Sequence, residues 1–162
     1  MSSAQRLSLY GVFTALITLA TTFLKVPGPT GFYHLGDVFI YTAAAVMGGP
    51  FAAATASVGS ALADVWAGYA TFAPWTLVIK GVAGYVAGAV PTRYGRRYRV
   101  PSMIAGALII TAGYAVATAV MFDPAAAVAE TAGNLLQSGV GVLGAIALVS
   151  AVERAFHRGS GS

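Results

Sequence analysis

Residues Leu7 to Leu24 read LSLYGVFTALITLATTFL, a run of 18 residues without a charged side chain. A helix that spans the hydrocarbon core of a bilayer needs about 20 predominantly apolar residues, so this run predicts a transmembrane helix. It is longer than the apolar part of a cleavable secretory signal, and Lys25 and a Pro/Gly-rich loop follow it in place of a small-residue cleavage site. We therefore expect it to be the first helix of a membrane domain.

The composition extends this prediction to the whole chain. Hydrophobic residues make up 57% of it and charged residues 9%, with a mean hydropathy of +0.76, whereas soluble domains carry roughly 25% charged residues. The absence of cysteine excludes a disulfide framework and a thiolate metal site. We predict an all-α integral membrane protein with one six-helix domain over residues 1–158. Residues 159–162, Gly-Ser-Gly-Ser, resemble a flexible linker scar.

Pro and Gly residues divide the remaining apolar sequence into five further helices. These are expected at Tyr33–Met47, Pro50–Tyr69, Pro74–Val90, Pro101–Phe122 and Ala125–Phe156, the last irregular near its start. An alternative joins the second and third helices and gives five crossings. Charge placement favours six, because both termini are then cytoplasmic and seven of the nine basic residues fall on that side. The seven are Arg6, Arg93, Arg96, Arg97, Arg99, Arg154 and Arg158.

Polar side chains at membrane depth are costly, and each is therefore a candidate for function. His34 and Asp37 are three residues apart, so on one helix they would share a face and could bond each other or a ligand; the alternative is a capping role. A metal site is disfavoured because no further His or Cys completes a ligand set. Asp64 and Lys80 are expected to form an ion pair near the outer helix ends, or to line a polar cavity there.

Four aromatic residues fall within ten positions between Asp64 and Lys80, namely Trp66, Tyr69, Phe72 and Trp75. They predict either an interfacial aromatic belt or a stacking wall for a flat ligand, and the two interpretations are compatible.

The sixth predicted helix carries a polar stripe formed by Glu130, Asn134 and Gln137. These side chains predict either interhelical hydrogen bonds or recognition of a ring edge that bears nitrogens and carbonyls. The sequence has no phosphate-binding loop, no His-Glu-x-x-His and no Gly-x-Ser-x-Gly. Binding or permeation is therefore expected rather than catalysis. The basic run Arg93–Arg99 is interpreted as a cytoplasmic loop and not as a nucleic-acid site.

Three stretches resemble one family. The first is Tyr33-His-Leu-Gly-Asp37 with Gly48-Gly-Pro50. The second is Gly59-Ser-Ala-Leu-Ala-Asp64 with Gly68-Tyr69, Ala73-Pro74, Lys80-Gly81 and Gly88, and the third is Gly133-Asn134-Leu-Leu-Gln137. In this order, and in a chain of this length, they resemble the substrate-binding S components of energy-coupling factor (ECF) vitamin transporters.

The resemblance implies six helices, cytoplasmic termini, a prokaryotic plasma-membrane location and an outward-facing pocket beneath the loop that joins the first two helices. It implies capture of a small water-soluble vitamin or precursor, for which we favour a pyrimidine or pyridine vitamer, with no cofactor. The expected substrate-binding residues are Tyr33, His34, Asp37, Asp64, Trp66, Tyr69, Trp75, Lys80, Glu130, Asn134 and Gln137.

The expected partners are a transmembrane coupling subunit and two ATP-binding subunits, since the chain lacks an ATP site of its own. The face formed by Gly11 and Ala15 resembles the Ala-x-x-x-Ala surface that docks on the coupling subunit. Two alternatives remain open: a small oligomeric channel or self-sufficient carrier, and a membrane enzyme. A channel would need a polar stripe through both halves of the membrane, and an enzyme could draw only on His34, Asp37 and Asp64.

Overall fold

Six helices and a two-stranded hairpin make up the computed structural model of the chain, which describes the backbone of residues 2–159 and the side chains of residues 2–154. The elements are α1 (Ser3–Phe23), β1 (Lys25–Pro27), β2 (Phe32–His34), α2 (Gly36–Met47), α3 (Gly49–Trp66), α4 (Ala73–Tyr94), the short 3-10 helix η1 (Arg96–Tyr98), α5 (Arg99–Met121) and α6 (Pro124–Gly159). Of the predicted linker scar, residues 160–162 lie outside the described part.

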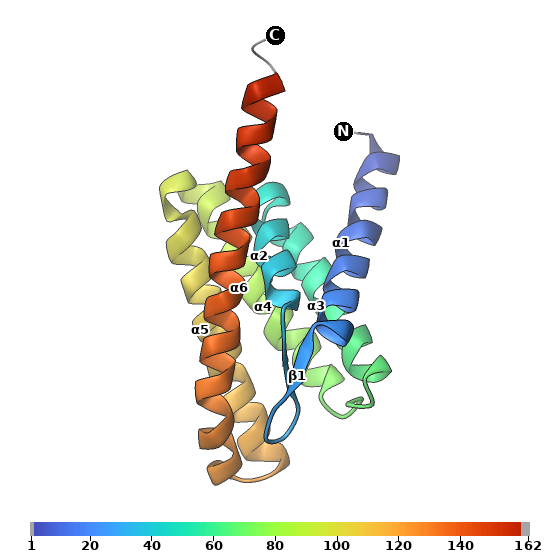
Figure 1. Cartoon of the computed structure of the whole chain (residues 1–162), viewed down its shortest axis with the longest axis vertical. Coiled ribbons are helices and arrows are strands. Elements are labelled where there is room, and N and C mark those ends of the chain that lie inside the picture. The colour runs from blue at the N-terminus through green and yellow to red at the C-terminus, as the bar shows by residue number, and fades with distance from the viewer. Residues whose placement is uncertain (1, 160–162) are drawn as a thin grey trace.

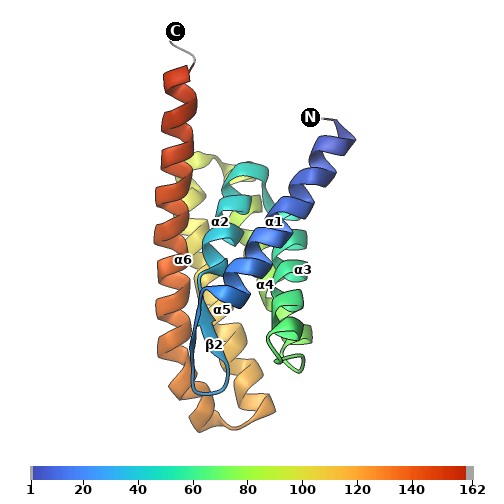
Figure 2. The ribbon, with the colours of Figure 1, turned by 45° about the vertical axis from the view of Figure 1, so that its right-hand side comes forward.

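The six helices do not contribute equally to crossing a membrane. Helices α1, α4, α5 and α6 are long and apolar enough to cross by themselves, whereas α2 is shorter. Its 12 residues rise about 18 Å at 1.5 Å per residue, which is well short of a hydrocarbon core of about 30 Å. The β1–β2 hairpin occupies the remaining depth beside α6, and α1 begins at the end of the molecule where α6 finishes (Figures 1 and 2). We call the opposite end the outer end, as the charge distribution predicts.

Small residues fill the interior and large apolar residues face outward. Ala52, Ala83 and Ala87 are completely buried, whereas Leu136 is 71% exposed and Leu143 69%. A soluble protein would bury such leucines, but in lipid they cost nothing on the outside, and small side chains let helix backbones approach closely. This distribution confirms the prediction of a helical membrane protein.

The closest backbone approach lies where α2 turns into α3. Gly48 separates the two helices with φ +87°, a conformation that favours glycine, and Gly88 of α4 packs directly against this corner. A Cβ atom at Gly88 would lie 2.5 Å from the carbonyl carbon of Gly48 and from the amide nitrogen of Gly49. The corner confirms that the second and third helices are separate, so the five-crossing alternative is wrong.

Helix α4 continues to Tyr94, beyond its predicted end at Val90. The additional turn contains Pro91, although proline has no N–H to donate to the carbonyl four residues earlier. That carbonyl belongs to Ala87, and it accepts a hydrogen bond from the Ser102 hydroxyl of α5 at 2.9 Å. A neighbouring helix thus supplies the missing donor, as is common for proline in membrane helices.

The hairpin is the main departure from the predicted elements. Helix α2 begins at Gly36 rather than Tyr33, and both Tyr33 and His34 belong to β2, which pairs antiparallel with β1. His34 and Asp37 therefore do not share a helical face. Helix α3 ends at Trp66 rather than Tyr69, with Gly68 at φ +87° just beyond it.

Helix α6 also differs from its prediction, because it is regular from its start at Pro124. The Asp123 side chain accepts a hydrogen bond from the Ala126 N–H at 2.9 Å and so caps the first turn.

We expect Gly88→Ala to lower the thermal unfolding midpoint of the detergent-solubilised protein, because its methyl group meets backbone atoms that cannot move aside. Overpacking of this kind costs about 1–3 kcal/mol. Gly139→Ala is the matched control, since a Cβ there meets nothing within 4 Å, and helix propensity should leave it neutral or slightly more stable. Equal midpoints for the two variants would contradict the packing described at the corner.

Candidate functional site

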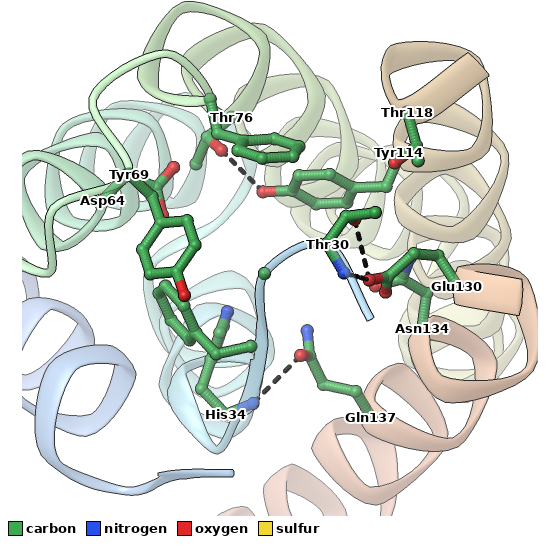
Figure 3. A pocket seen from close by; sticks show the side chains of 13 residues that line it. Thr30, His34, Asp64, Tyr69, Thr76, Tyr114, Thr118, Glu130, Asn134 and Gln137 are labelled. Atoms are coloured by element: carbon green, nitrogen blue, oxygen red, sulfur yellow. Dashed lines mark hydrogen bonds between the residues drawn. The ribbon is translucent and has the colours of Figure 1, made fainter. Parts of the chain in front are cut away.

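A cavity lies under the hairpin at the outer end of the helix bundle. Its lining side chains come from the hairpin, from α3 to α6 and from the α3–α4 loop (Figure 3): Thr30, Gly31, Phe32, His34, Asp64, Tyr69, Phe72, Thr76, Tyr114, Thr118, Glu130, Asn134 and Gln137. Six of the eleven predicted binding residues are among them, namely His34, Asp64, Tyr69, Glu130, Asn134 and Gln137. The structure thus brings together residues that are up to 103 positions apart in the sequence.

Glu130 of α6 holds the tip of the hairpin. Its Oε1 accepts hydrogen bonds from the Thr30 N–H at 2.6 Å and the Thr30 hydroxyl at 2.8 Å, and its Oε2 accepts one from the Tyr33 hydroxyl at 2.9 Å. The Tyr33 ring also lies against Gly133, one turn further along α6. Hydrogen bonds to a carboxylate are stronger than those between neutral groups. Glu130 therefore fastens the hairpin over the cavity, and we call this set of contacts the hairpin latch.

Gln137 connects the hairpin to the interior of the bundle. Its Oε1 accepts from the His34 N–H at 3.0 Å, and its Nε2 donates to Asp37 Oδ2 at 3.0 Å. The other oxygen of Asp37, Oδ1, pairs with Lys80 Nζ at 2.5 Å, and both side chains are completely buried. One continuous network thus joins β2, α6, α2 and α4.

The ion pair of Lys80 differs from the prediction. Lys80 pairs with Asp37 and not with Asp64, because Asp37 on α2 lies across from Lys80 inside the bundle. Neither Asp37 nor Lys80 lines the cavity; both lie outside its lining and support it through Gln137. An unpaired charge at this depth would be expensive, so each residue needs the other.

His34 carries no charge in this setting. Its Nδ1 accepts a hydrogen bond from the Gly36 N–H at 3.1 Å, which places the ring proton on Nε2. His34 can therefore donate a hydrogen bond without a change of charge at neutral pH.

The aromatic wall of the cavity differs in part from the predicted one. Phe32, Tyr69, Phe72 and Tyr114 line it, and the Phe32 and Tyr69 rings meet edge to face at 5.1 Å. The two tryptophans and Tyr33 do not line it. Trp66 is 66% exposed on the outside of α3, where its ring meets that of Phe23, and the half-buried Trp75 packs against the hydrophobic core. Both tryptophans face away from the cavity because they lie on the other sides of their helices.

Asp64 and Asn134 have polar atoms in the lining without a hydrogen-bond partner in the described part of the chain, as do the hydroxyl groups of Tyr69 and Thr118. Asp64 is 7% exposed, and its Oδ2 is buried without a hydrogen-bond partner. Glu130 differs, because both of its carboxyl oxygens accept hydrogen bonds from the hairpin. The Asn134 side chain, 8% exposed, makes no hydrogen bond. Buried polar groups are nearly always paired, so Asp64 and Asn134 are groups that a ligand could satisfy.

Phe72 was one of the four aromatics of the predicted stacking wall, but several other lining residues were not predicted: Thr30, Gly31, Phe32, Thr76, Tyr114 and Thr118. Tyr114 and Thr118 are four residues apart on α5, and this i, i+4 polar pair on an apolar helix is a signal that could have found them. Tyr114 shares a hydrogen bond of 2.7 Å with Thr76. The hairpin residues Thr30 to Phe32 carry no such pattern.

The comparisons with known proteins cover almost the whole chain. The family described as "ECF-type riboflavin transporter, S component" matches residues 1–154. The protein named thiamine precursor transporter HmpT from Lactococcus lactis subsp. cremoris (strain MG1363) is 31% identical over 153 residues, which is 93% of this chain and 89% of the relative. An uncharacterized protein from Pyrococcus woesei is 33% identical over 132 residues, 78% of this chain and 87% of the relative.

We expect Lys80→Met to destabilise the protein by about 3–5 kcal/mol, because it leaves the Asp37 carboxylate buried without its cation. The double variant Asp37→Asn with Lys80→Met should recover most of this loss, since neither charge remains. Thermal unfolding of the two single variants and the double variant in detergent measures the coupling. Additive losses would show that the two residues do not depend on each other.

Proposed function

The chain belongs to the ECF-type riboflavin transporter S component family, and on this premise we propose that it captures a small water-soluble vitamin or precursor in the cavity under the hairpin. The observation that supports this most directly is the position of the cavity. It lies at the outer end and is lined by aromatic rings and by polar groups without partners. The family of the chain is one of membrane transport components, which agrees with the expectation of binding rather than catalysis.

The hairpin acts as the gate in this proposal. The closed cavity leaves about 50 Å³ of space, whereas pockets for small organic ligands measure about 300–1,000 Å³. A vitamin therefore enters only when the hairpin moves away from α6 and the latch at Glu130 opens. The latch bonds would re-form around the bound ligand and close the site.

A flat nitrogen heterocycle suits the cavity best, and we propose a pyrimidine or pyridine vitamer. The rings of Phe32, Tyr69 and Tyr114 offer surfaces for stacking, and the Asn134 amide can donate to and accept from a ring edge. The name of the Lactococcus relative, a thiamine precursor transporter, supports this direction. The family description points to riboflavin, which has a larger, tricyclic ring system and would need a wider opening.

Transport would depend on partners that supply energy. We propose that Gly11 and Ala15 dock on a transmembrane coupling subunit driven by two ATP-binding subunits. Both residues are exposed on α1, and a Cβ at Gly11 meets nothing within 4 Å, so this face is not used for packing within the chain. Tyr10, Leu62 and Trp66 border the same shallow groove. A small-residue face of this kind permits close helix approach.

The direct test is binding by the purified chain alone. We expect native mass spectrometry or calorimetry in detergent to show one vitamin or precursor bound per chain without turnover. A panel of pyrimidine, pyridine and flavin vitamers should contain at least one tight ligand. Failure of every member to bind would reject the proposal.

Two substitutions separate binding from coupling. Asn134→Ala should weaken binding by about 10-fold or more, because it removes a group whose partner is the ligand. Gly11→Leu should leave binding unchanged but abolish uptake in cells that contain the coupling module, because the larger side chain prevents docking. Calorimetry and radiolabelled uptake measure the two effects. Loss of binding in Gly11→Leu would contradict the assignment of this face.

The latch predicts a kinetic effect for Gly133→Ala. The added methyl group displaces the Tyr33 ring and so weakens the Tyr33 bond to Glu130, and the hairpin should open more often. We expect ligand dissociation to be about 10-fold faster in stopped-flow measurements, since one hydrogen bond to a charged group contributes about 1.5–3 kcal/mol. Gly139→Ala on the same helix is the control and should leave the rate unchanged. An unchanged rate in Gly133→Ala would argue against the hairpin as a gate.

A further inference from the structure

The two carboxyl groups in the cavity lining differ in what remains available to a ligand. Both oxygens of Glu130 accept bonds from the hairpin, whereas Oδ2 of Asp64 accepts none and is buried. The one buried lysine of the bundle interior, Lys80, pairs with Asp37. Within the described residues, Asp64 therefore has an oxygen that no group of the protein satisfies.

An unsatisfied carboxyl oxygen is costly. Of the five buried side-chain atoms without a partner in the described residues, Asp64 Oδ2 is the one that belongs to the cavity lining, where a ligand could supply the missing bond. Figure 3 shows Asp64 and Tyr69 on one side of the cavity, with Glu130 and Asn134 on the other. A ligand between them meets an acceptor at one edge and an amide, which can donate and accept, at the opposite edge. The aromatic rings fix its plane between these edges.

The lining also lacks any basic side chain. None of the thirteen residues that surround the cavity is Lys or Arg, and His34 Nδ1 accepts a hydrogen bond, as in a neutral imidazole. An anionic group in this space would face the carboxylates of Asp64 and Glu130, whereas the two lysines nearby lie outside the lining: Lys80 is paired with Asp37, and Lys25 lies over the Phe32 ring. Like charges brought together in a desolvated site repel strongly.

We propose that Asp64 determines the substrate class of this site, by accepting hydrogen bonds from an amino group or protonated nitrogen on the edge of a flat heterocycle. The site consequently takes amino-substituted rings in their unphosphorylated form and rejects phosphate esters. This inference rests on the proposed function, because it assumes that the cavity is the vitamin site. It adds two properties of the ligand to that function: an edge that donates hydrogen bonds, and the absence of a phosphate group.

Matched ligands test the inference on the unmodified protein. The probes are 4-amino-5-(hydroxymethyl)pyrimidine, its 4-oxo counterpart and the phosphate ester of the amino compound, with riboflavin in parallel. We expect the amino compound to bind at least 10-fold more tightly than either pyrimidine analogue in calorimetry. Equal or tighter binding of the oxo compound or of the phosphate ester would overturn the inference.

Asp64→Asn tests the residue itself. The substitution keeps the shape but replaces one acceptor oxygen by a donor, so it should weaken binding of the amino compound about 10- to 100-fold and reduce its preference over the oxo compound to about 3-fold or less. Asp123→Asn is the matched control, because Asp123 is exposed between α5 and α6 and an asparagine can also cap α6. Unchanged binding in Asp64→Asn would overturn the assignment.

The outcomes separate this inference from the proposed function. If riboflavin alone binds tightly and Asp64→Asn does not affect it, the chain is a vitamin-binding subunit but Asp64 does not select its substrate. If no vitamer binds at all, both proposals fail. A thermal unfolding midpoint equal to that of the parent protein shows that Asp64→Asn is folded, and the ligand comparison on the parent protein does not depend on any variant.

Discussion

The buried ion pair between Asp37 and Lys80 is the interaction on which the rest of the structure depends. Both side chains are completely inaccessible to solvent. Removing two charges from water costs several kcal/mol for each ion, and their attraction offsets this cost only in good geometry with further hydrogen bonds. Gln137 supplies the further bond, and through it the pair fixes α2 and α4 relative to α6 and to β2. Three apolar side chains in these positions could hold the helices together without the free-energy cost of burying charges. The ionic network instead fixes which residues of the three helices face one another, and thus the position of the hairpin above them.

The hairpin follows from a constraint of length. Helix α2 is too short to reach the outer end, so the chain between α1 and α2 covers that depth in another conformation. Unpaired backbone groups are not tolerated in lipid. Here the two strands pair with each other, while Glu130 and Gln137 accept hydrogen bonds from the Thr30 and His34 N–H groups. The same bonds that make the segment acceptable at this depth also close the cavity. A closure built from a few hydrogen bonds to side chains can open without disturbing the helices, which a seventh helix in this place could not do.

The fold could be predicted from the sequence because its signals are local. Apolar runs, proline positions and the placement of arginines each determine a helix or an orientation without reference to other parts of the chain. The errors occur where a distant residue changes the result: Ser102 supports Pro91 within α4, and pairing with β1 keeps Tyr33 and His34 out of α2. The predicted partner of Lys80 was wrong for the same reason, since sequence proximity favoured Asp64.

Polar site residues at membrane depth can be predicted from the sequence, because they stand out against an apolar background. The tryptophans cannot be distinguished from cavity residues in this way, since a membrane interface and a ligand pocket both favour aromatic rings.

Asp64 and Glu130 show how one residue type performs two functions in the same cavity. Both lie in the outer part of the helix bundle, where little water reaches them. A carboxylate in such a place needs hydrogen bonds or an opposite charge. Glu130 accepts hydrogen bonds from the hairpin, and these bonds stabilise the closed site. Thr76 and the charge of Lys80 act on the Asp64 carboxyl group, but its Oδ2 has no hydrogen-bond partner in the described part of the chain, so a ligand with a donor edge can supply one. If the ligand supplies that missing partner, ligand binding and closure of the hairpin favour each other. The closed hairpin excludes water from the bond that Asp64 makes, which strengthens it. The ligand in turn fills the space that the closed hairpin encloses.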